Sequence, residues 1–159
     1  MKYAIRELTA QDDAALEAVI RACLIEHGAN HAGTAWADPF LSRLSTVYGD
    51  ERNRYWVAVS ESGRVVGGAG IGRSEFADDV CELQKMYCLP ECRGIGVSHM
   101  LMDECLAFAK LHYRRCFLET LQNMVAAQRF YEKYGFARTD ERFGDAAHFS
   151  CDVRYILDF

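Results

Sequence analysis

One stretch of the sequence, Cys81–Met102, limits the folds open to this chain more than any other. Its first part, up to Leu89, is mostly apolar, and Pro90 ends it because proline has no N–H to donate to a sheet. The segment Arg93–Gly96 contains two glycines, which allow a tight turn and leave backbone N–H groups uncovered by side chains. Apolar residues then recur at helical spacing, at Val97, Met100, Leu101, Cys105, Phe108 and Leu111. The stretch predicts a strand, a glycine-rich loop and a helix.

The start of this helix is suited to a phosphate group. The first N–H groups of a helix have no intrahelical partner and lie at the positive end of the helix dipole. Short glycine motifs are common, however, so these glycines could equally serve only to pack the strand against the helix. An earlier strand also contains glycines, at positions 67, 68, 70 and 72, and these have two similar interpretations. They could allow close packing on another backbone, or they could form a second phosphate loop.

Composition narrows the class of protein. A chain of 159 residues, half of them hydrophobic, is expected to form a single domain over residues 1–159. Its net charge of -5 argues against nucleic acid as a partner, since such a protein needs a basic face. Seven cysteines without a C-x-x-C pair favour free thiols over disulfides or a metal site. Without a signal peptide or membrane span, we expect a cytoplasmic protein that uses no membrane.

The hydrophobic pattern predicts the order of the remaining elements. Three strands joined by tight turns imply an antiparallel meander, and the Cys81–Met102 unit followed by another strand implies a parallel crossover. The fold class is therefore α/β, a mixed sheet with helices on both faces. The expected strands are 3–8, 55–60, 64–72, 81–89, 115–121 and 148–159, and the expected helices are 9–28, 40–49, 97–111 and 126–134.

Two motifs in this arrangement resemble the GCN5-related N-acetyltransferases, the GNAT superfamily. The coenzyme A signature of that family fits Arg93, Gly96 and Ser98, with serine as the final small residue. Its late helix resembles the segment AAQRFYEKYGF at 126–136. The family usually has an asparagine seven residues before the tyrosine, whereas this chain has Met124 there and Asn123 one residue earlier. The resemblance implies the GNAT-type acyl-CoA N-acyltransferase fold, with a central, mostly antiparallel sheet.

The resemblance also implies acetyl-CoA as cosubstrate, with no metal. The diphosphate would bind the N–H groups of the glycine loop, with added charge from Arg93. The pantetheine arm would run along the central strand, which the family splays from the next parallel strand. Whether Asn123 contacts the coenzyme is left open. The residues expected at the coenzyme are Met86, Tyr87, Cys88, Arg93, Gly94, Ile95, Gly96, Val97, Ser98 and Asn123.

Tyr131 matches the family's general acid, which protonates the departing thiolate. The alternative is that Tyr131 only packs within the apolar stripe of its helix, as we expect for Tyr134. Glu82 is the candidate base for the amine and Glu119 its rival; either could instead be a solvated or salt-bridged strand residue. His148 and Cys151, close in sequence, could form a nucleophilic pair or simply be structural residues.

The predicted function is direct acetyl transfer from acetyl-CoA to a primary amine of a small molecule, amino acid or peptide. The alternative is a non-catalytic acyl-CoA-binding or sensor domain of the same fold. A nucleotide-binding domain unrelated to acyl transfer is disfavoured, because it would need a parallel sheet. An early loop with His31, Thr34 and Trp36 could line the acceptor pocket, but the sequence does not identify the amine. A homodimer is common in the family, and no feature here predicts its interface.

Overall fold

A computed structural model of the chain describes residues 2–143 and 150–159, and it centres on one mixed sheet of seven strands. The strand order is β1-β2-β3-β4-β5-β7-β6, and every neighbouring pair is antiparallel except β4 and β5. The predicted mixed, mostly antiparallel sheet is therefore confirmed. The strands are β1 (Tyr3–Glu7), β2 (Arg54–Ser60), β3 (Val65–Arg73), β4 (Val80–Cys88), β5 (Arg115–Thr120), β6 (Ala137–Arg138) and β7 (Val153–Asp158).

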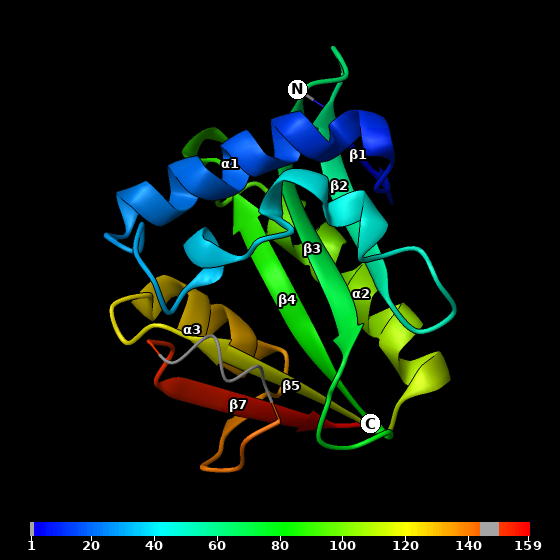
Figure 1. Ribbon diagram of the computed structural model, residues 1–159, viewed down its shortest axis with the longest axis vertical. Helices are drawn as coiled ribbons and strands as arrows, with labels where there is room; N and C mark the ends of the chain where they lie inside the picture. Colours follow the sequence, from blue (N-terminus) through cyan, green and yellow to red (C-terminus); the bar gives the residue numbers. More distant parts are fainter. Residues whose placement is uncertain (1, 144–149) are drawn as a thin grey trace.

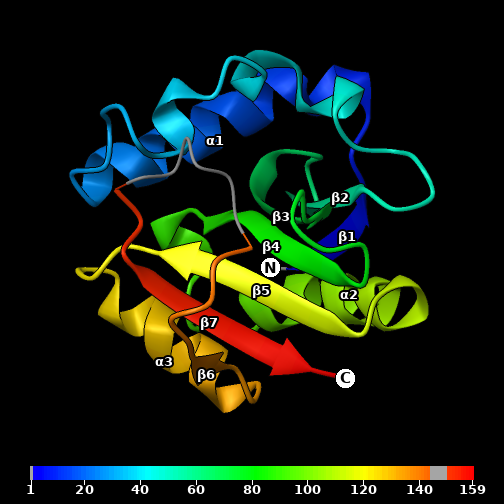
Figure 2. The same ribbon diagram turned by 60° about the horizontal axis from the view of Figure 1, so that its bottom comes forward.

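Helices cover both faces of the sheet, as predicted. Helix α1 lies on one face together with a cyan 3-10 segment, and α2 and α3 lie on the other face (Figures 1 and 2). The α-helices are α1 (Asp13–Glu26), α2 (Val97–His112) and α3 (Val125–Lys133). Short 3-10 helices are η1 (Ala10–Asp12), η2 (Ala35–Ala37), η3 (Leu41–Thr46) and η4 (Pro90–Cys92). Within the described parts of the chain, no helix is both long and apolar enough to cross a membrane.

A capping arrangement fixes the beginning of η1, the 3-10 helix that leads directly into α1. The carboxylate of Asp12 accepts hydrogen bonds from the backbone N–H of Thr9 at 2.9 Å and from the Arg6 guanidinium at 2.7 and 2.8 Å. Arg6 and Thr9 together lower the pKa of Asp12 to about 2, because both stabilise its charged form. The predicted apolar face of this helix is confirmed, since Leu16, Val19, Ile20, Cys23 and Leu24 are all buried.

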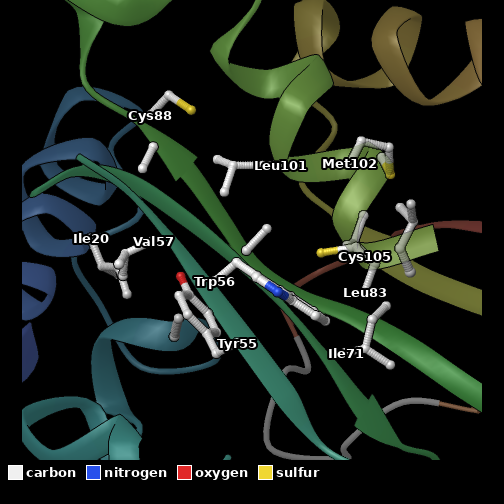
Figure 3. Close-up of a cluster of buried hydrophobic side chains, with 14 of the residues drawn as sticks. Ile20, Tyr55, Trp56, Val57, Ile71, Leu83, Cys88, Leu101, Met102 and Cys105 are labelled. Carbon is white, nitrogen blue, oxygen red and sulfur yellow. The ribbon is translucent and has the colours of Figure 1, made fainter. Parts of the chain in front are cut away.

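The buried core has two parts, one on each face of the sheet (Figure 3). Because side chains alternate along a strand, Tyr55 and Val57 of β2 face α1 while Trp56 faces α2. Trp56 makes an edge contact with Phe108 of α2, with ring centroids 5.5 Å apart. The sheet is therefore fixed between α1 and α2 at its β2–β4 centre.

The glycines of β3 make room for a side chain rather than for a phosphate. A Cβ at Gly68 would lie 2.5 Å from Cε1 of the Tyr55 ring, and one at Gly70 would also collide with that ring. A Cβ at Gly72 would meet the side chain of Gln84 instead. The expectation of close approach to another backbone holds for Gly67, whose Cβ would lie 2.8 Å from the Tyr87 carbonyl oxygen, and in part for Gly70, whose Cβ would lie 3.1 Å from the Arg54 carbonyl oxygen.

Two predicted elements differ in the structure. The helix expected at 40–49 is wrong, because this segment forms only the 3-10 helix η3, in which Arg43 has non-helical dihedral angles. The backbone N–H of Ser45 donates to the Asp13 carboxylate at 2.9 Å, so it does not join an α-helical ladder. The last strand begins at Val153 rather than near 148, and residues 144–149 lie outside the described residues.

The parallel pair β4–β5 is short compared with its strands. Its register covers Val80–Glu82 against Arg115–Phe117, three pairs at the beginning of strands that continue to Cys88 and Thr120. On its other side, β5 pairs with β7 along its whole length. The two parallel strands therefore separate after their first residues, as the family resemblance implied.

Candidate active site

A bulge interrupts β4 close to the point where it leaves β5. The register with β3 pairs Gly68 with Tyr87 but Gly70 with Gln84, so two residues of β4 lie opposite one of β3. Within this bulge Lys85 has a φ of 48°, the only positive value at a non-glycine residue in the described chain. The Tyr55 hydroxyl donates to the Lys85 carbonyl at 2.6 Å. The Tyr55 ring, seated over glycines, thus fixes the shape of the bulge.

A cavity of about 530 Å³ opens between the separated strands on the side of α2 and α3. Its walls come from the end of β4, the glycine loop, the first turn of α2, the β5–α3 connection and α3. Eight of the ten residues predicted at the coenzyme line it, namely Met86, Tyr87, Cys88, Arg93, Gly94, Gly96, Ser98 and Asn123. The other two do not: Ile95 is exposed, and the side chain of Val97 points into the core.

The glycine loop has the conformation that the sequence required. Gly94 and Gly96 have φ values of 74° and 96°, in the left-handed region that favours glycine, and Gly96 is the N-cap of α2. The helix therefore starts at the cavity wall, with its unpaired first N–H groups and the positive end of its dipole there. This arrangement provides an anion site made of backbone.

Arg93 has a partner that the sequence analysis did not anticipate. Its guanidinium makes two hydrogen bonds to the Glu26 carboxylate, at 2.6 and 2.8 Å, and its Nε donates to the Cys88 carbonyl at 2.9 Å. The positive charge expected to serve a phosphate is thus shared with the last residue of α1. In this arrangement Arg93 ties α1 to the end of β4 and to the glycine loop.

Asn123 also reaches α1 across the cavity. Its side-chain amide donates to the carbonyl of His27, the C-cap of α1, at 3.0 Å. His27 and Cys23 line the same cavity from α1. The displaced asparagine therefore borders the predicted coenzyme site while holding the end of a helix, and its contact with a coenzyme stays a prediction.

Tyr131 lies where the large cavity meets a second, smaller one of about 70 Å³ on the α1 side of the sheet, and it lines both. The tyrosine packs against the rings of Phe130, Phe136 and Tyr155. Burial raises the pKa of Tyr131, because the phenolate would lose its hydration, so the hydroxyl keeps its proton at neutral pH. The same residue thus both packs in the apolar stripe and borders the two cavities.

Tyr134, expected only to pack, also has polar contacts. Its hydroxyl lies 3.0 Å from Nδ1 of His99 and 3.1 Å from a carboxylate oxygen of Asp103. Burial and the Asp103 carboxylate raise the pKa of Tyr134 to about 12. Its ring lies against Phe130, with centroids 5.2 Å apart, so the packing role is present as well.

The smaller cavity is lined by charged side chains from the centre of the sheet. Both candidate bases, Glu82 and Glu119, contribute to its wall, and so does Lys85. Lys85 pairs with Asp38 at 2.7 Å, and Glu119 lies 4.0 Å from Nε of Arg154 on β7. Glu82 is only 5% exposed, so it is a buried cavity residue and not a solvated strand residue.

The early loop contributes to this cavity through a different set of residues than expected. Thr34 and Ala35 line it, and Thr34 is held by hydrogen bonds from its hydroxyl to the carbonyls of Ala29 and His31. His31 is exposed and Trp36 packs under the guanidinium of Arg21, and neither is part of this wall. The expected role of the loop is thus supported only for Thr34.

Cys151 borders the smaller cavity, but its chemistry does not favour a nucleophile. Burial, together with the charges of Glu119 and Glu82, raises the pKa of its thiol to about 12. A nucleophilic cysteine needs a lowered pKa instead. His148, the other half of the hypothetical pair, lies outside the described residues.

The sequence analysis missed several residues of the large cavity: Cys23, His27, His99, Met124, Val125, Ala126, Ala127 and Phe130. Some could have been found, because Ala126, Ala127 and Phe130 belong to the stripe of the recognised helix. Cys23 and His27 are four residues apart on α1, so they share a face, but nothing in the sequence indicates what that face meets.

Comparison with known proteins agrees with this geometry. The sequence profile of the Acetyltransferase (GNAT) family matches residues 15–136. The uncharacterized N-acetyltransferase YjgM of Escherichia coli (strain K12) is 39% identical over 157 residues, covering 97% of this chain and 93% of the relative. The N-acetylaspartate synthetase of Xenopus tropicalis is 40% identical over 83 residues, 52% of this chain and 30% of that protein.

Solved structures share the fold. A GNAT-family acetyltransferase from Staphylococcus aureus Mu50 superposes with a TM-score of 0.87 at 18% identity, covering 99% of each chain. A phosphinothricin acetyltransferase from Sinorhizobium meliloti, solved with AcCoA, has a TM-score of 0.75 at 18% identity over 99% of this chain and 89% of that one. The chain belongs to the GNAT acetyltransferase family. Its relatives make it an N-acetyltransferase, so the non-catalytic alternative is set aside.

Proposed function

We propose that this protein transfers an acetyl group from acetyl-CoA directly to the primary amine of a small molecule. The observation that carries the proposal is the position of Tyr131, which lines both a large cavity beside a helix start and a small charged cavity. A thioester in the first and an amine in the second would meet at this tyrosine. Holding two substrates next to each other in this way can supply a large part of the rate enhancement of a two-substrate enzyme.

In this proposal the large cavity holds the coenzyme. The diphosphate lies against the N–H groups at the start of α2, where Gly94 and Gly96 let its oxygens approach the backbone. The pantetheine arm follows β4 past Cys88 and Met86, along the edge that β5 leaves unpaired. A backbone N–H on this edge polarises the thioester carbonyl as the tetrahedral intermediate forms. Family members solved with acetyl-CoA support this use of the fold.

Tyr131 then acts as the general acid. When the tetrahedral intermediate collapses, the carbon–sulfur bond breaks and the thiolate accepts the phenolic proton. The raised pKa of Tyr131 keeps this proton in place until the sulfur atom becomes negative. The nitrogen carries one proton more than the amide product, and it gives this proton to the tyrosinate, directly or through water, so that the phenol is restored.

Glu82 is the base in this proposal, with Glu119 as its rival. Both line the small cavity, and Glu82 lies at the last pair of the β4–β5 ladder, next to the point where the strands separate. An amine that enters as an ammonium ion must lose one proton before it attacks, and a carboxylate can take it directly or through water. Burial helps because an unsolvated carboxylate is a stronger base.

The size of the small cavity favours a small acceptor over a folded protein. Its volume of about 70 Å³ suits a ligand of a few heavy atoms, such as a small amino acid, better than a segment of a folded protein. The name of the Xenopus tropicalis relative, N-acetylaspartate synthetase, is consistent with an amino-acid acceptor. We further propose a reducing, cytosolic environment, because six of the seven free cysteines are buried as thiols.

The test of this function has two steps. Titration calorimetry should detect acetyl-CoA binding, and a thiol reagent should then detect free coenzyme A when an amine from a mixed panel is added. No binding at millimolar acetyl-CoA would refute the coenzyme site. Binding without thiol release across amines, amino acids and peptides would refute the transfer reaction.

A further inference from the structure

Lys85 has a conformation that a lysine rarely adopts. Its φ of 48° lies in the left-handed region, which is unfavourable for a residue with a Cβ. The Tyr55 hydroxyl holds its carbonyl at 2.6 Å, and the glycines at positions 68 and 70 leave space for the Tyr55 ring. Backbone strain supported in this way often marks a functional position. The bulge turns Lys85 toward the small cavity, whose wall it joins.

The charge of Lys85 is also buried, which a surface lysine avoids. Its side chain is 9% exposed, and that of Asp38, its partner at 2.7 Å, is 17% exposed. Burying two charges costs desolvation energy that their attraction often fails to recover. A structural explanation exists, because the pair ties the loop before η3 to the sheet. An apolar contact would make the same connection without that cost, so stability alone does not explain a lysine here.

The small cavity presents both signs of charge. Lys85 supplies an ammonium group, while Glu82 and Glu119 supply carboxylates to the same wall. An ammonium has three N–H donors, so Lys85 can bind a second carboxylate while it keeps its ion pair with Asp38. Complementary charges in a cavity select the ligand that carries the opposite pattern. The matching pattern is a small molecule with an amine and a carboxylate.

We propose that Lys85 binds the carboxylate of the acceptor, so that the acceptor is a small amino acid and not a simple amine. The amine then lies on the side of Glu82, next to Tyr131 and the thioester, and the carboxylate lies toward Lys85 and the early loop. This inference rests on the proposed function, since it assigns the substrate class of the same transfer site. Lys85 is a residue that determines specificity; it takes no part in bond breaking.

The experiment offers each proteinogenic amino acid as a free acceptor and compares it with the α-carboxamide of the same amino acid. The carboxamide keeps the size and the amine but removes the negative charge of the carboxylate. Release of coenzyme A is measured for the wild type and for Lys85→Met, Lys85→Arg, Asp38→Asn and the control Lys110→Met. Lys110 is an exposed residue of α2, so this control makes the same chemical change away from either cavity. Binding of the amino acids to the coenzyme A-loaded protein is measured in parallel by calorimetry.

The wild type should prefer the best amino acid over its amide by about 10- to 100-fold in kcat/KM, the range expected for a hydrogen-bonded charge. Lys85→Met should remove most of this preference by raising KM for the amino acid toward the KM of its amide. Lys85→Arg and Lys110→Met should keep the preference. Asp38→Asn should also keep the preference for the amino acid, even if its thermal stability falls. If the Lys85–Asp38 pair had only a structural role, Lys85→Met and Asp38→Asn would both lose activity on the amino acid and on the amide.

Equal rates of the wild type on acids and amides would overturn the proposal, and so would a preference that survives in Lys85→Met. If no amine leads to release of coenzyme A, the proposed transfer function is refuted. The calorimetry then tests the carboxylate site at Lys85 separately. Amino-acid binding that is lost in Lys85→Met would then still support the carboxylate site, and no amino-acid binding in the wild type would refute it. Unfolding of Lys85→Met is checked through its affinity for acetyl-CoA, which should match that of the wild type.

Discussion

The two cavities that meet at Tyr131 are built in different ways. The larger one, of about 530 Å³, takes its distinctive features from backbone: a glycine loop, a helix start and the free edge of β4. The smaller one, of about 70 Å³, is lined by the charged side chains Glu82, Glu119 and Lys85. A ligand common to a family can be bound by backbone, whereas an acceptor that differs between members is selected by side chains. The difference predicts that substitutions should affect the two ligands separately.

The largest effect should come from a charge placed at the backbone site. Gly96→Glu should weaken acetyl-CoA binding by at least 100-fold, because it puts a carboxylate at the proposed diphosphate site and forces a side chain into the left-handed region. Calorimetry measures this affinity. Gly63→Glu is a matched control, since Gly63 has a φ of 83° with open space around it and lines neither cavity. Equal loss of affinity in the two variants would mean that strain, and not the phosphate site, is responsible.

Removing the hydroxyl of Tyr131, which lines both cavities, should slow the acetyl transfer without weakening the binding of acetyl-CoA. Tyr131→Phe should lower kcat by about 100-fold, the usual value of one acid–base group, while the Kd for acetyl-CoA changes by less than about threefold. Tyr113→Phe serves as the control, because it removes a tyrosine hydroxyl that donates to the Arg52 carbonyl, and Tyr113 lines neither cavity. An unchanged kcat in Tyr131→Phe would leave Tyr131 with only its packing role.

The charged cavity offers a direct comparison of two carboxylates. Glu82→Gln should lower kcat/KM at neutral pH by about 10- to 100-fold, and raising the pH should restore part of the loss because more of the amine is then already neutral. Glu119→Gln should have a smaller effect without this recovery, since Glu119 is associated with Arg154. The pH profile of kcat/KM for both variants is the measurement. The reverse order of effects would make Glu119 the base.

The smallest effect concerns α1, which borders both cavities but is anchored away from them. The folded-state pKa of Asp12, about 2, lies below its ordinary value of 3.8, so its stabilisation is complete above about pH 4 and is lost as the pH falls toward 2. Asp12→Asn should therefore reduce the free energy of unfolding by about 1–2 kcal/mol at pH 7, discounted for the exposure of Arg6, and by less at pH 3.

Urea unfolding at the two pH values measures this effect, with the exposed Asp140→Asn as the control. Both ligand affinities should stay unchanged in Asp12→Asn. Altered affinity for either ligand would show that the start of α1 is coupled to the cavities.

The difference between features made by local backbone and contacts made by distant side chains also explains what could be predicted from the sequence. Gly94 and Gly96 were predicted at the coenzyme site because a left-handed turn before a helix is a local requirement that glycine satisfies. The Glu26 partner of Arg93 lies 67 residues away in the chain, and no local pattern indicates that pair. The helix expected at 40–49 failed for a similar reason, since the contact between Ser45 and Asp13 overrides its helical spacing.

The acceptor cavity was the least predictable part. Glu82 was identified through the family resemblance, but Lys85 was not, because a bulge depends on how two strands pair rather than on either strand alone. The glycines of β3 gave a visible signal, and its meaning required the ring of Tyr55, which belongs to a different strand. Side chains that select an acceptor thus come from several elements whose proximity exists only in the fold.

The short ladder between β4 and β5 has a consequence for cooperative unfolding. For unfolding, strands β1–β4 with helix α2 form one unit and strands β5–β7 form another. Helix α2 packs mainly on β2 and β3, and the β4–β5 ladder joins the two half-sheets through three residue pairs. So short a ladder is expected to be the boundary between two cooperatively unfolding units (foldons), and native-state hydrogen exchange can resolve such units. A molecule that spans the gap between β4 and β5 would act like an added strand, and its binding would couple the opening of the two halves.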